Sequence, residues 1–304
     1  MRLASIDLGS NSLIMTVVDL NNGQLKPVAE EVKIVRLGQA LQPGGRLQPE
    51  AKERCRSALH HFAHQMEFLA VDEIIGVGTA ALRNASDGQQ FVDEIKDQLH
   101  ILIQIISGDD EARLTFKAVQ RDFSRLGDSL VMIDIGGGST ELVMGDLNSI
   151  TSQISMNAGT VSFSERFVHK DPPTSEELQS AARAINKMMD RFELKSTAME
   201  AVGVAGTFTT LKAVQLGMDD YDHSQIHRTI LLRDEIAQLG QLFTSMPTEE
   251  RKNLKGLPEE RADIIPMGVV IIDSIMKRLQ HQSITISDRG LRWGLLYEWV
   301  ERNG

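Results

Sequence analysis

The sequence predicts an α/β protein built from two duplicated domains with a ligand cleft between them. Residues 6–21 align without a gap on residues 133–148, and seven of the sixteen positions are identical. In both copies an apolar run leads to an aspartate, a turn of small residues and a second apolar run, which is the pattern of two strands joined by a tight turn. Duplication of one supersecondary unit is the simplest explanation of this repeat.

The rest of the first half alternates between strand and helix patterns. Apolar alternation predicts strands at residues 3–7, 12–20 and 25–37. After these the pattern predicts a helix at 49–69, a strand at 73–77, helices at 80–85 and 87–99, a strand at 102–106 and a helix that opens near Asp109.

The second half begins in the same way, with strands predicted at residues 129–134, 140–145 and 149–156. A helix at 174–192 follows two prolines and starts with capping residues. Further along we expect a strand at 201–204, a turn at Gly206 with a helix to about residue 216, helices at 233–244 and 259–279, a strand at 283–287 and a last helix at 290–302. The expected domains are residues 1–121 plus 289–304 and residues 122–288, joined near residues 122–128.

Composition limits the class of protein. Hydrophobic residues make up 41% and charged residues 24% of the 304 positions, which is ordinary for a soluble globular chain. A net charge of −10 opposes nonspecific binding to nucleic acid. We find neither a membrane-length apolar run nor a secretory signal pattern, so we expect a cytoplasmic protein without nucleic-acid or membrane partners. The single cysteine, Cys55, is expected to be a packing residue.

The two glycine turns point to phosphate chemistry. Glycine lets the backbone approach a ligand closely, and consecutive turn amides form a concave anion site. Asp7 and Asp134 end the first strand of each copy. A carboxylate beside a phosphate is favourable when a hard cation such as Mg²⁺ lies between them. The residues alone leave open the alternative that both aspartates only cap their turns.

Seven motifs, spread over almost the whole chain, occur in the order typical of the exopolyphosphatase/guanosine pentaphosphate phosphatase family. In one-letter code they are DLGSNS (7–12), GTAALR (78–83), ISGDDEAR (106–113), DIGGGSTE (134–141), GVAGT (203–207), ERAD (260–263) and DRGLRWG (288–294). The resemblance implies the duplicated actin-like, or ribonuclease H-like, fold that this family shares with Hsp70 and sugar kinases.

The resemblance also implies an activity and a set of site residues. We expect a Mg²⁺-dependent hydrolase that releases the terminal phosphate of guanosine pentaphosphate or of short-chain polyphosphate. Glu111 matches the glutamate that activates the attacking water, and Arg83 matches an arginine on the phosphate chain. The expected metal ligands are Asp7, Asp134 and Glu141. The expected phosphate-binding residues are Gly9, Ser10, Asn11, Ser12, Gly136, Gly137, Gly138, Ser139, Thr140, Gly206 and Thr207.

Several of these assignments have structural alternatives. From the residues alone, Asp109 and Asp110 are as plausible as Glu111, and Arg83 could pair with a surface carboxylate. The turn at Gly206 suits either a phosphate at a helix N-terminus or close packing. The chain has Val204-Ala205 and residues 156–159 where the family often has serine or cysteine, which puts hydroxyl contacts there in doubt.

Other functions and states also follow from these features. A small-molecule kinase of the same fold would need an acceptor pocket, and a weakly catalytic regulator would only sense guanosine tetraphosphate or another nucleotide. The sequence has no His-Asp dipeptide of the kind found in the C-terminal region of long family members, so processive action on long chains is not expected. The apolar last helix is expected to dock on the N-terminal domain or on a second subunit, and a homodimer is expected by analogy.

Overall fold

The computed structural model describes residues 1–42, 44–123, 129–192 and 199–303. Its internal contacts divide the chain into two compact units. Unit 1 comprises Met1–Ala118 and Leu291–Gly304, and unit 2 comprises Val119–Gly290. The junction expected near residues 122–128 lies mostly outside the described residues, which omit residues 124–128.

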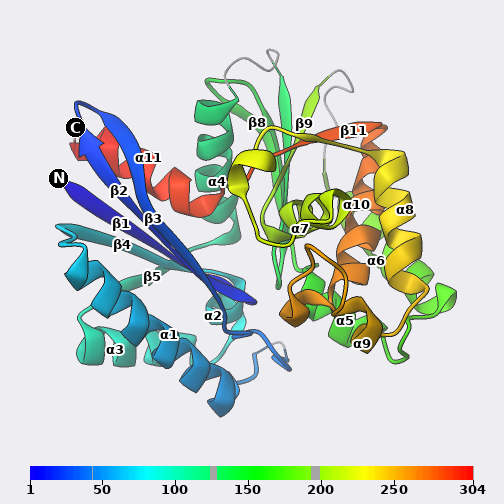
Figure 1. Cartoon of the computed structure of the whole chain (residues 1–304), viewed down its shortest axis with the longest axis horizontal. Helices are drawn as coiled ribbons and strands as arrows, with labels where there is room; N and C mark the ends of the chain where they lie inside the picture. Colours follow the sequence, from blue (N-terminus) through cyan, green and yellow to red (C-terminus); the bar gives the residue numbers. More distant parts are fainter. Residues whose placement is uncertain (43, 124–128, 193–198, 304) are drawn as a thin grey trace. The chain divides into compact units, whose positions relative to one another are not determined.

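Unit 1 contains a five-stranded sheet, here called sheet A, with strand order β3-β2-β1-β4-β5 (Figure 1). The first three strands form an antiparallel meander, and β4 and β5 run parallel to β1. The strands are β1 (Arg2–Leu8), β2 (Ser12–Asn21), β3 (Gln24–Ile34), β4 (Glu73–Gly78) and β5 (Ile103–Ile105).

Helices pack on both faces of sheet A. The helices of unit 1 are α1 (Pro49–Phe68), α2 (Ala80–Asn84), α3 (Gly88–Leu99), α4 (Gly108–Asp122), which runs on into unit 2, and α11 (Leu291–Asn303). Ala4, Ile6 and Leu8 of β1 share a buried cluster with residues of α1 and α3. Leu3, on the opposite face of β1, packs with Trp293 and other residues of α11. Side chains alternate between the faces of a strand, so Asp7 lies on the same face as Leu3.

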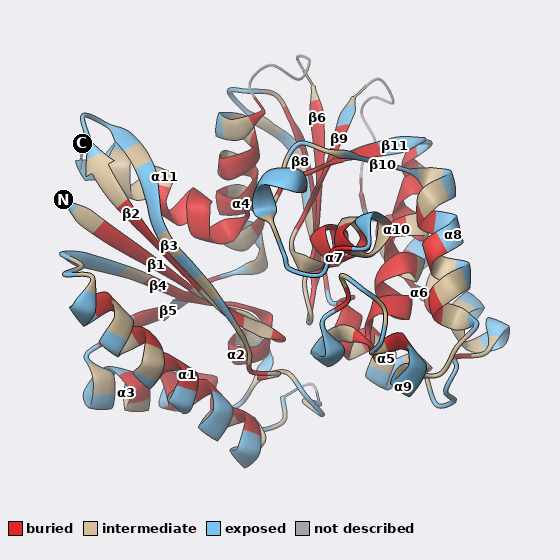
Figure 2. Cartoon of the chain, viewed as in Figure 1, coloured by how far each residue is buried: buried red, intermediate tan, exposed pale blue. Residues whose placement is uncertain are grey.

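Unit 2 contains a six-stranded sheet, here called sheet B, with strand order β10-β11-β9-β6-β7-β8. It repeats the antiparallel meander and the two parallel strands of sheet A and adds an antiparallel edge strand. Figure 2 shows β6 and β9 buried along most of their length. The strands are β6 (Leu130–Ile135), β7 (Thr140–Gly145), β8 (Ile150–Met156), β9 (Glu200–Val204), β10 (Ile230–Leu232) and β11 (Ser283–Ile286).

One face of sheet B carries the largest apolar cluster of the described residues. Val131, Ile133 and Ile135 of β6 point into it, together with buried residues of α6, α7, α8 and α10. By alternation Asp134 lies on the other face. The helices of unit 2 are α5 (Thr160–Phe167), α6 (Ser175–Met189), α7 (Gly206–Leu216), α8 (Arg233–Thr244), α9 (Thr248–Arg251) and α10 (Ile265–Leu279), with short 3₁₀ turns at His223–Gln225 and Glu259–Arg261.

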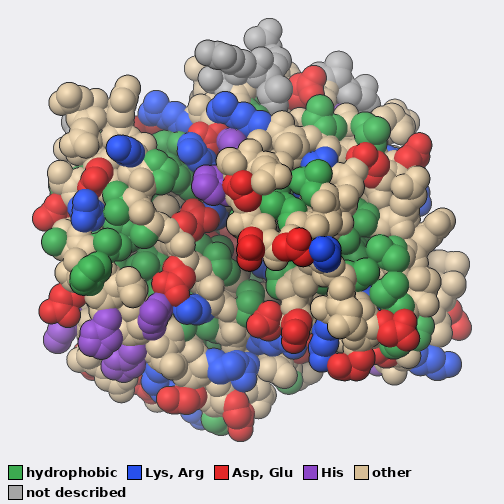
Figure 3. All heavy atoms as spheres, viewed as in Figure 1, with side chains coloured by type: hydrophobic (Ala, Val, Ile, Leu, Met, Phe, Trp, Pro, Cys, Tyr) green, Lys and Arg blue, Asp and Glu red, His purple; other side chains and the backbone are tan. Residues whose placement is uncertain are grey.

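The shared strand order confirms the predicted α/β fold with two related sheets. The structure adds α5, α9 and β10, which are short and lack a clear sequence pattern. The last helix docks on sheet A, so the first of its two expected positions is the one observed. Within the described residues, no helix combines the length and apolar character that would let it cross a bilayer. On the face drawn in Figure 3, basic side chains are interspersed with acidic ones.

Candidate active site

The carboxyl ends of three parallel strands lie side by side at one edge of sheet A. Leu8 on β1 pairs with Gly78 on β4, and Gly78 pairs with Ile105 on β5. The chain leaves these three ends as the turn at residues 9–12, as helix α2 and as helix α4. Ligands of open α/β sheets bind at this edge. The topology therefore gathers the predicted site residues of unit 1 where such a sheet binds ligands.

The first glycine turn is braced by the loop that follows β3. The N–H of Gly9 donates to the carbonyl of Ser12 at 2.9 Å, while the carbonyls of Ser10 and Asn11 accept N–H groups from residues 35–38. The Asn11 side chain is only 5% exposed, and neither of its amide atoms has a hydrogen-bond partner among the described residues. Leaving a buried amide unpaired costs about 1–3 kcal/mol. A ligand that bonds to it would recover that cost.

The structure brings together the two predicted catalytic residues. Arg83 on α2 donates through Nη1 to Oε2 of Glu111 on α4 at 3.1 Å and to the carbonyl of Ile106 at 2.9 Å. The Glu111 side chain is 12% exposed, whereas Asp109 and Asp110 are exposed. The geometry thus separates Glu111 from the two neighbouring acids that the sequence could not exclude.

The second glycine turn repeats the first. The N–H of Gly136 donates to the carbonyl of Ser139 at 3.0 Å, the same bond at the same place in the repeat. Here the brace is the start of α5, where Val161 and Ser162 donate N–H groups to the Gly137 carbonyl. The hydroxyl of Thr140 donates a hydrogen bond to the Ala158 carbonyl, and this bond links the second glycine turn to the segment before α5.

Two predicted metal ligands lie opposite each other in sheet B. Asp134 on β6 pairs in register with Glu141 on β7, and the side chains of these residues are on the face opposite the large apolar cluster. Asp134 is 8% exposed and Glu141 1% exposed. Ser155 on β8 donates its hydroxyl to Oε1 of Glu141 at 2.7 Å.

This carboxylate pair fits Mg²⁺. No group of three or more His, Cys, Asp or Glu side chains that could enclose a metal occurs among the described residues. Mg²⁺ typically takes only one or two protein carboxylates and completes its octahedron with water and substrate phosphate. Asp134 and Glu141 supply two hard oxygen donors of that kind. Asp7, the third predicted ligand, is partly buried near the end of β1 in unit 1.

A third turn joins β9 to α7 at the carboxyl edge of sheet B. Ala205 adopts φ 73° and ψ 175°, a region that residues other than glycine rarely occupy and that costs about 1–3 kcal/mol. Thr207 donates its hydroxyl to the carbonyl of Ile135 at 3.0 Å, which ties α7 to the end of β6. The N-terminus of α7 presents unpaired amides and the positive end of the helix dipole, which favour an anion.

Arg261 lies against this turn. A Cβ built on Gly206 would stand 2.3–2.5 Å from the Nη2, Nη1 and Cζ atoms of Arg261, so the guanidinium packs directly on the glycine. Burial lowers the pKa of Arg261, although Tyr221 and Glu260 partly oppose the effect. The guanidinium therefore adds a positive charge beside the first residue of α7.

Comparison with known proteins places the chain in a family. The model of the Ppx/GppA phosphatase family matches residues 16–303. The chain belongs to this family. Exopolyphosphatase 2 of Mycobacterium tuberculosis is 31% identical over 311 residues, with 97% of each chain covered. The guanosine-5'-triphosphate,3'-diphosphate pyrophosphatase of Vibrio cholerae is also 31% identical, over 98% of this chain and 59% of that protein. The crystal structure of an exopolyphosphatase from Cytophaga hutchinsonii superposes with a TM-score of 0.91 at 26% identity, covering 99% of this chain and 98% of that one.

Membership of the Ppx/GppA family confirms the predicted class of enzyme, a phosphohydrolase, over the kinase alternative. Sequence reasoning assigned no role to Arg261, although it lies in one of the motifs that carry the family resemblance. The missing signal was its contact with Gly206, because the two residues are 55 positions apart. An arginine in a polar motif does not reveal which residue far along the sequence it contacts.

Proposed function

We propose that this Ppx/GppA protein is a Mg²⁺-dependent phosphohydrolase that releases the terminal phosphate of guanosine pentaphosphate or of short-chain inorganic polyphosphate. The observation that carries the proposal is the Arg83–Glu111 pair beside the glycine turn at the carboxyl edge of sheet A. Relatives named for each of the two substrates are equally identical to this chain, so both substrates belong to the proposal.

In the proposed reaction, one set of residues stabilises the negative charge of the phosphate oxygens, and Glu111 orients the attacking water. The transition state is loose, and negative charge spreads over the oxygens of the transferred group. In unit 2, the amides of the second glycine turn, the N-terminus of α7 and Arg261 would bind phosphate oxygens. In unit 1, the amides of the first turn and the Asn11 amide would do the same. In unit 2, Asp134 and Glu141 would hold Mg²⁺, which supplies positive charge to phosphate oxygens when bound. In unit 1, Asp7 is the carboxylate proposed as a metal ligand.

Glu111 would orient the attacking water. The hydrogen bond from Arg83 fixes the orientation of the Glu111 carboxylate, which would in turn accept a hydrogen bond from the attacking water. The water oxygen bonds to the terminal phosphorus as the bond to the bridging oxygen breaks, and the water protons pass to phosphate or solvent. The products are inorganic phosphate and a substrate one phosphate shorter. Orientation matters more than basicity in a loose transition state, because proton removal can be late.

The test measures phosphate release without an added acceptor. Guanosine pentaphosphate, short polyphosphate, long polyphosphate and ATP are supplied separately with Mg²⁺, and each is repeated with a chelator. Glu111→Gln should lower kcat by about 10²-fold or more, as expected for loss of a group that positions the nucleophile. Asp109→Asn is the matched control, because this exposed neighbour on the same helical turn should leave the rate unchanged.

Each part of the proposal can fail separately. If the wild-type protein releases phosphate from none of these substrates, the proposed function is wrong. Equal rates for Glu111→Gln and wild type would contradict the role of Glu111 in the reaction. Full activity in the presence of the chelator would contradict the requirement for Mg²⁺. Release from ATP alone would point to a nucleotide phosphatase of another specificity.

A further inference from the structure

Helix α11 lies closely against the backbone of helix α4 at Gly294. A Cβ built on Gly294 would lie 1.9 Å from the carbonyl oxygen of Leu114, 2.6 Å from its carbonyl carbon and 3.3 Å from its Cα. Real Cβ atoms essentially never come within 3.0 Å of other heavy atoms, and here the obstacle is backbone, which cannot rotate aside. Gly294 therefore sets how closely the two helices approach.

Ion pairs continue this contact along both helices. Arg113 on α4 donates to Glu298 on α11 at 2.5 Å, and Lys117 donates to Glu301 at 2.5 Å. The Glu298 side chain is 13% exposed. Burial by itself would raise the pKa of Glu298, but the hydrogen bond and charge of Arg113 outweigh it and hold the pKa below its usual value. The pair therefore stays charged at neutral pH and fixes the position of α4 along α11.

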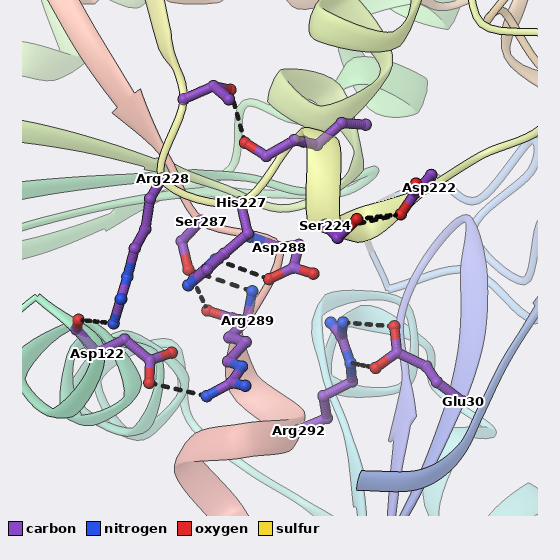
Figure 4. Close-up of polar contacts among 12 residues, drawn as sticks. Glu30, Asp122, Asp222, Ser224, His227, Arg228, Ser287, Asp288, Arg289 and Arg292 are labelled. Carbon is purple, nitrogen blue, oxygen red and sulfur yellow. Dashed lines mark hydrogen bonds and ion pairs between the residues drawn. The ribbon is translucent and has the colours of Figure 1, made fainter.

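Helix α11 is itself held firmly on sheet A. Arg292 donates to both carboxylate oxygens of Glu30 on β3, at 2.7 and 3.2 Å (Figure 4). Trp293 and Leu296 are 3% and 0% exposed and pack against Leu3 of β1. If the two helices were forced apart, α11 would have to break these contacts, so α4 is the helix that should move.

Glu111 lies on α4 one turn before Leu114, close to the contact with Gly294. On a helix, residues three apart are neighbours, so a displacement of the Leu114 carbonyl carries Glu111 with it. The hydrogen bond between Arg83 and Glu111 is a contact that such a displacement would stretch. Because the bond is 3.1 Å long, a shift of about 1 Å would exceed normal hydrogen-bond geometry.

We propose that α11 is a positioning element for catalysis, in which Gly294 and Glu298 hold α4 at the distance that places Glu111 to orient the attacking water. The inference rests on the proposed function, because it assigns these residues to the water-orienting carboxylate. Neither residue would touch substrate. Their role explains the glycine of the last motif, which the phosphate-binding turns do not use.

The experiment compares Gly294→Ala with the wild-type protein by phosphate release over a range of substrate concentrations, which gives both kcat and KM. A misplacement of about 1 Å at a reacting group costs about 10²-fold, so kcat should fall by that factor while KM changes less than about twofold. Gly240→Ala is the matched control. Gly240 lies in helix α8 of unit 2, and a Cβ built on it would lie 2.8 Å from a side-chain atom of Val269. That variant tests crowding of a helix by alanine away from Glu111, and its kcat should remain normal.

A second measurement separates positioning from general damage. In the background of Glu111→Gln, Gly294→Ala should lower the remaining rate little further, since the carboxylate that it positions is gone. If Gly294→Ala does not fold, Glu298→Gln takes its place, with an expected loss of about tenfold in kcat and the same dependence on Glu111. An active wild type and an inactive Glu111→Gln together with normal kcat in both α11 variants would overturn the inference and leave the proposed function standing. A loss that adds fully to that of Glu111→Gln, or an equal loss in Gly240→Ala, would also overturn it.

Discussion

Gly159 has no space for a side chain, and replacing it by alanine perturbs the second glycine turn directly. It is the residue before α5, whose first turn donates hydrogen bonds to the carbonyls of residues 137 and 138. A Cβ built on Gly159 would lie 2.3 Å from both the carbonyl carbon and the carbonyl oxygen of Gly137, and 2.4 Å from the nitrogen of Gly138. All three atoms belong to the backbone that is proposed to hold phosphate.

The size of the effect follows from these distances. Ordinary contact with a Cβ begins at 3.4 Å, so the turn and α5 must separate by about 1.1 Å along the contact with Gly137. Displacement of about 1 Å in a binding turn should lower kcat/KM by about 10²-fold, which equals about 2.7 kcal/mol in transition-state free energy. Crowding of the packed turn should also lower the free energy of unfolding by about 1–3 kcal/mol.

The assay measures kcat/KM for phosphate release and the urea-induced unfolding of Gly159→Ala. Gly217→Ala serves as the control, because Gly217 has φ +60° at the end of α7 and an alanine there meets strain but no neighbouring atom. That variant should lose about 1 kcal/mol of stability and keep its activity. The reasoning is refuted if Gly159→Ala keeps wild-type kcat/KM, or if the control loses as much activity.

Two further predictions concern charge. Arg261→Met should raise KM by about tenfold or more, since it removes a charged donor from the proposed phosphate site, and it should change the unfolding temperature little, since burial of the charged guanidinium is itself unfavourable; a normal KM or a large loss of stability would contradict this. His281 is half buried, and burial lowers its pKa against a weaker opposing effect of Glu200. Its pKa is thus lower in the folded than in the unfolded state, so the contribution of neutral His281 is fully present above about pH 6.5 and is lost as pH falls toward the folded-state pKa. The free energy of unfolding should therefore fall between pH 7.5 and pH 5, and His281→Gln should flatten that dependence in urea titrations; equal slopes for the two proteins would contradict the assignment.

Local pattern was enough to predict the duplicated strand-turn-strand units. The alternation of apolar residues has the period of a strand, and small residues follow it in both copies. The same backbone bond then forms in both turns, from Gly9 to Ser12 and from Gly136 to Ser139. These features depend on residues close in sequence, which is why the sequence alone predicts them. The pattern did not predict the short elements α5, α9 and β10, because a segment of three to eight residues carries too little periodicity.

The sequence by itself determined the repeated α/β architecture, the two glycine turns and the class of chemistry that such turns serve. Only the tertiary structure decided which residues meet. It separated Glu111 from Asp109 and Asp110 by placing one carboxylate on Arg83, and it revealed the packing of Arg261 on Gly206 and of Gly294 on Leu114. The physical reason is that a local pattern specifies a strand or a turn, whereas a contact between residues far apart in sequence depends on how the whole sheet and its helices pack.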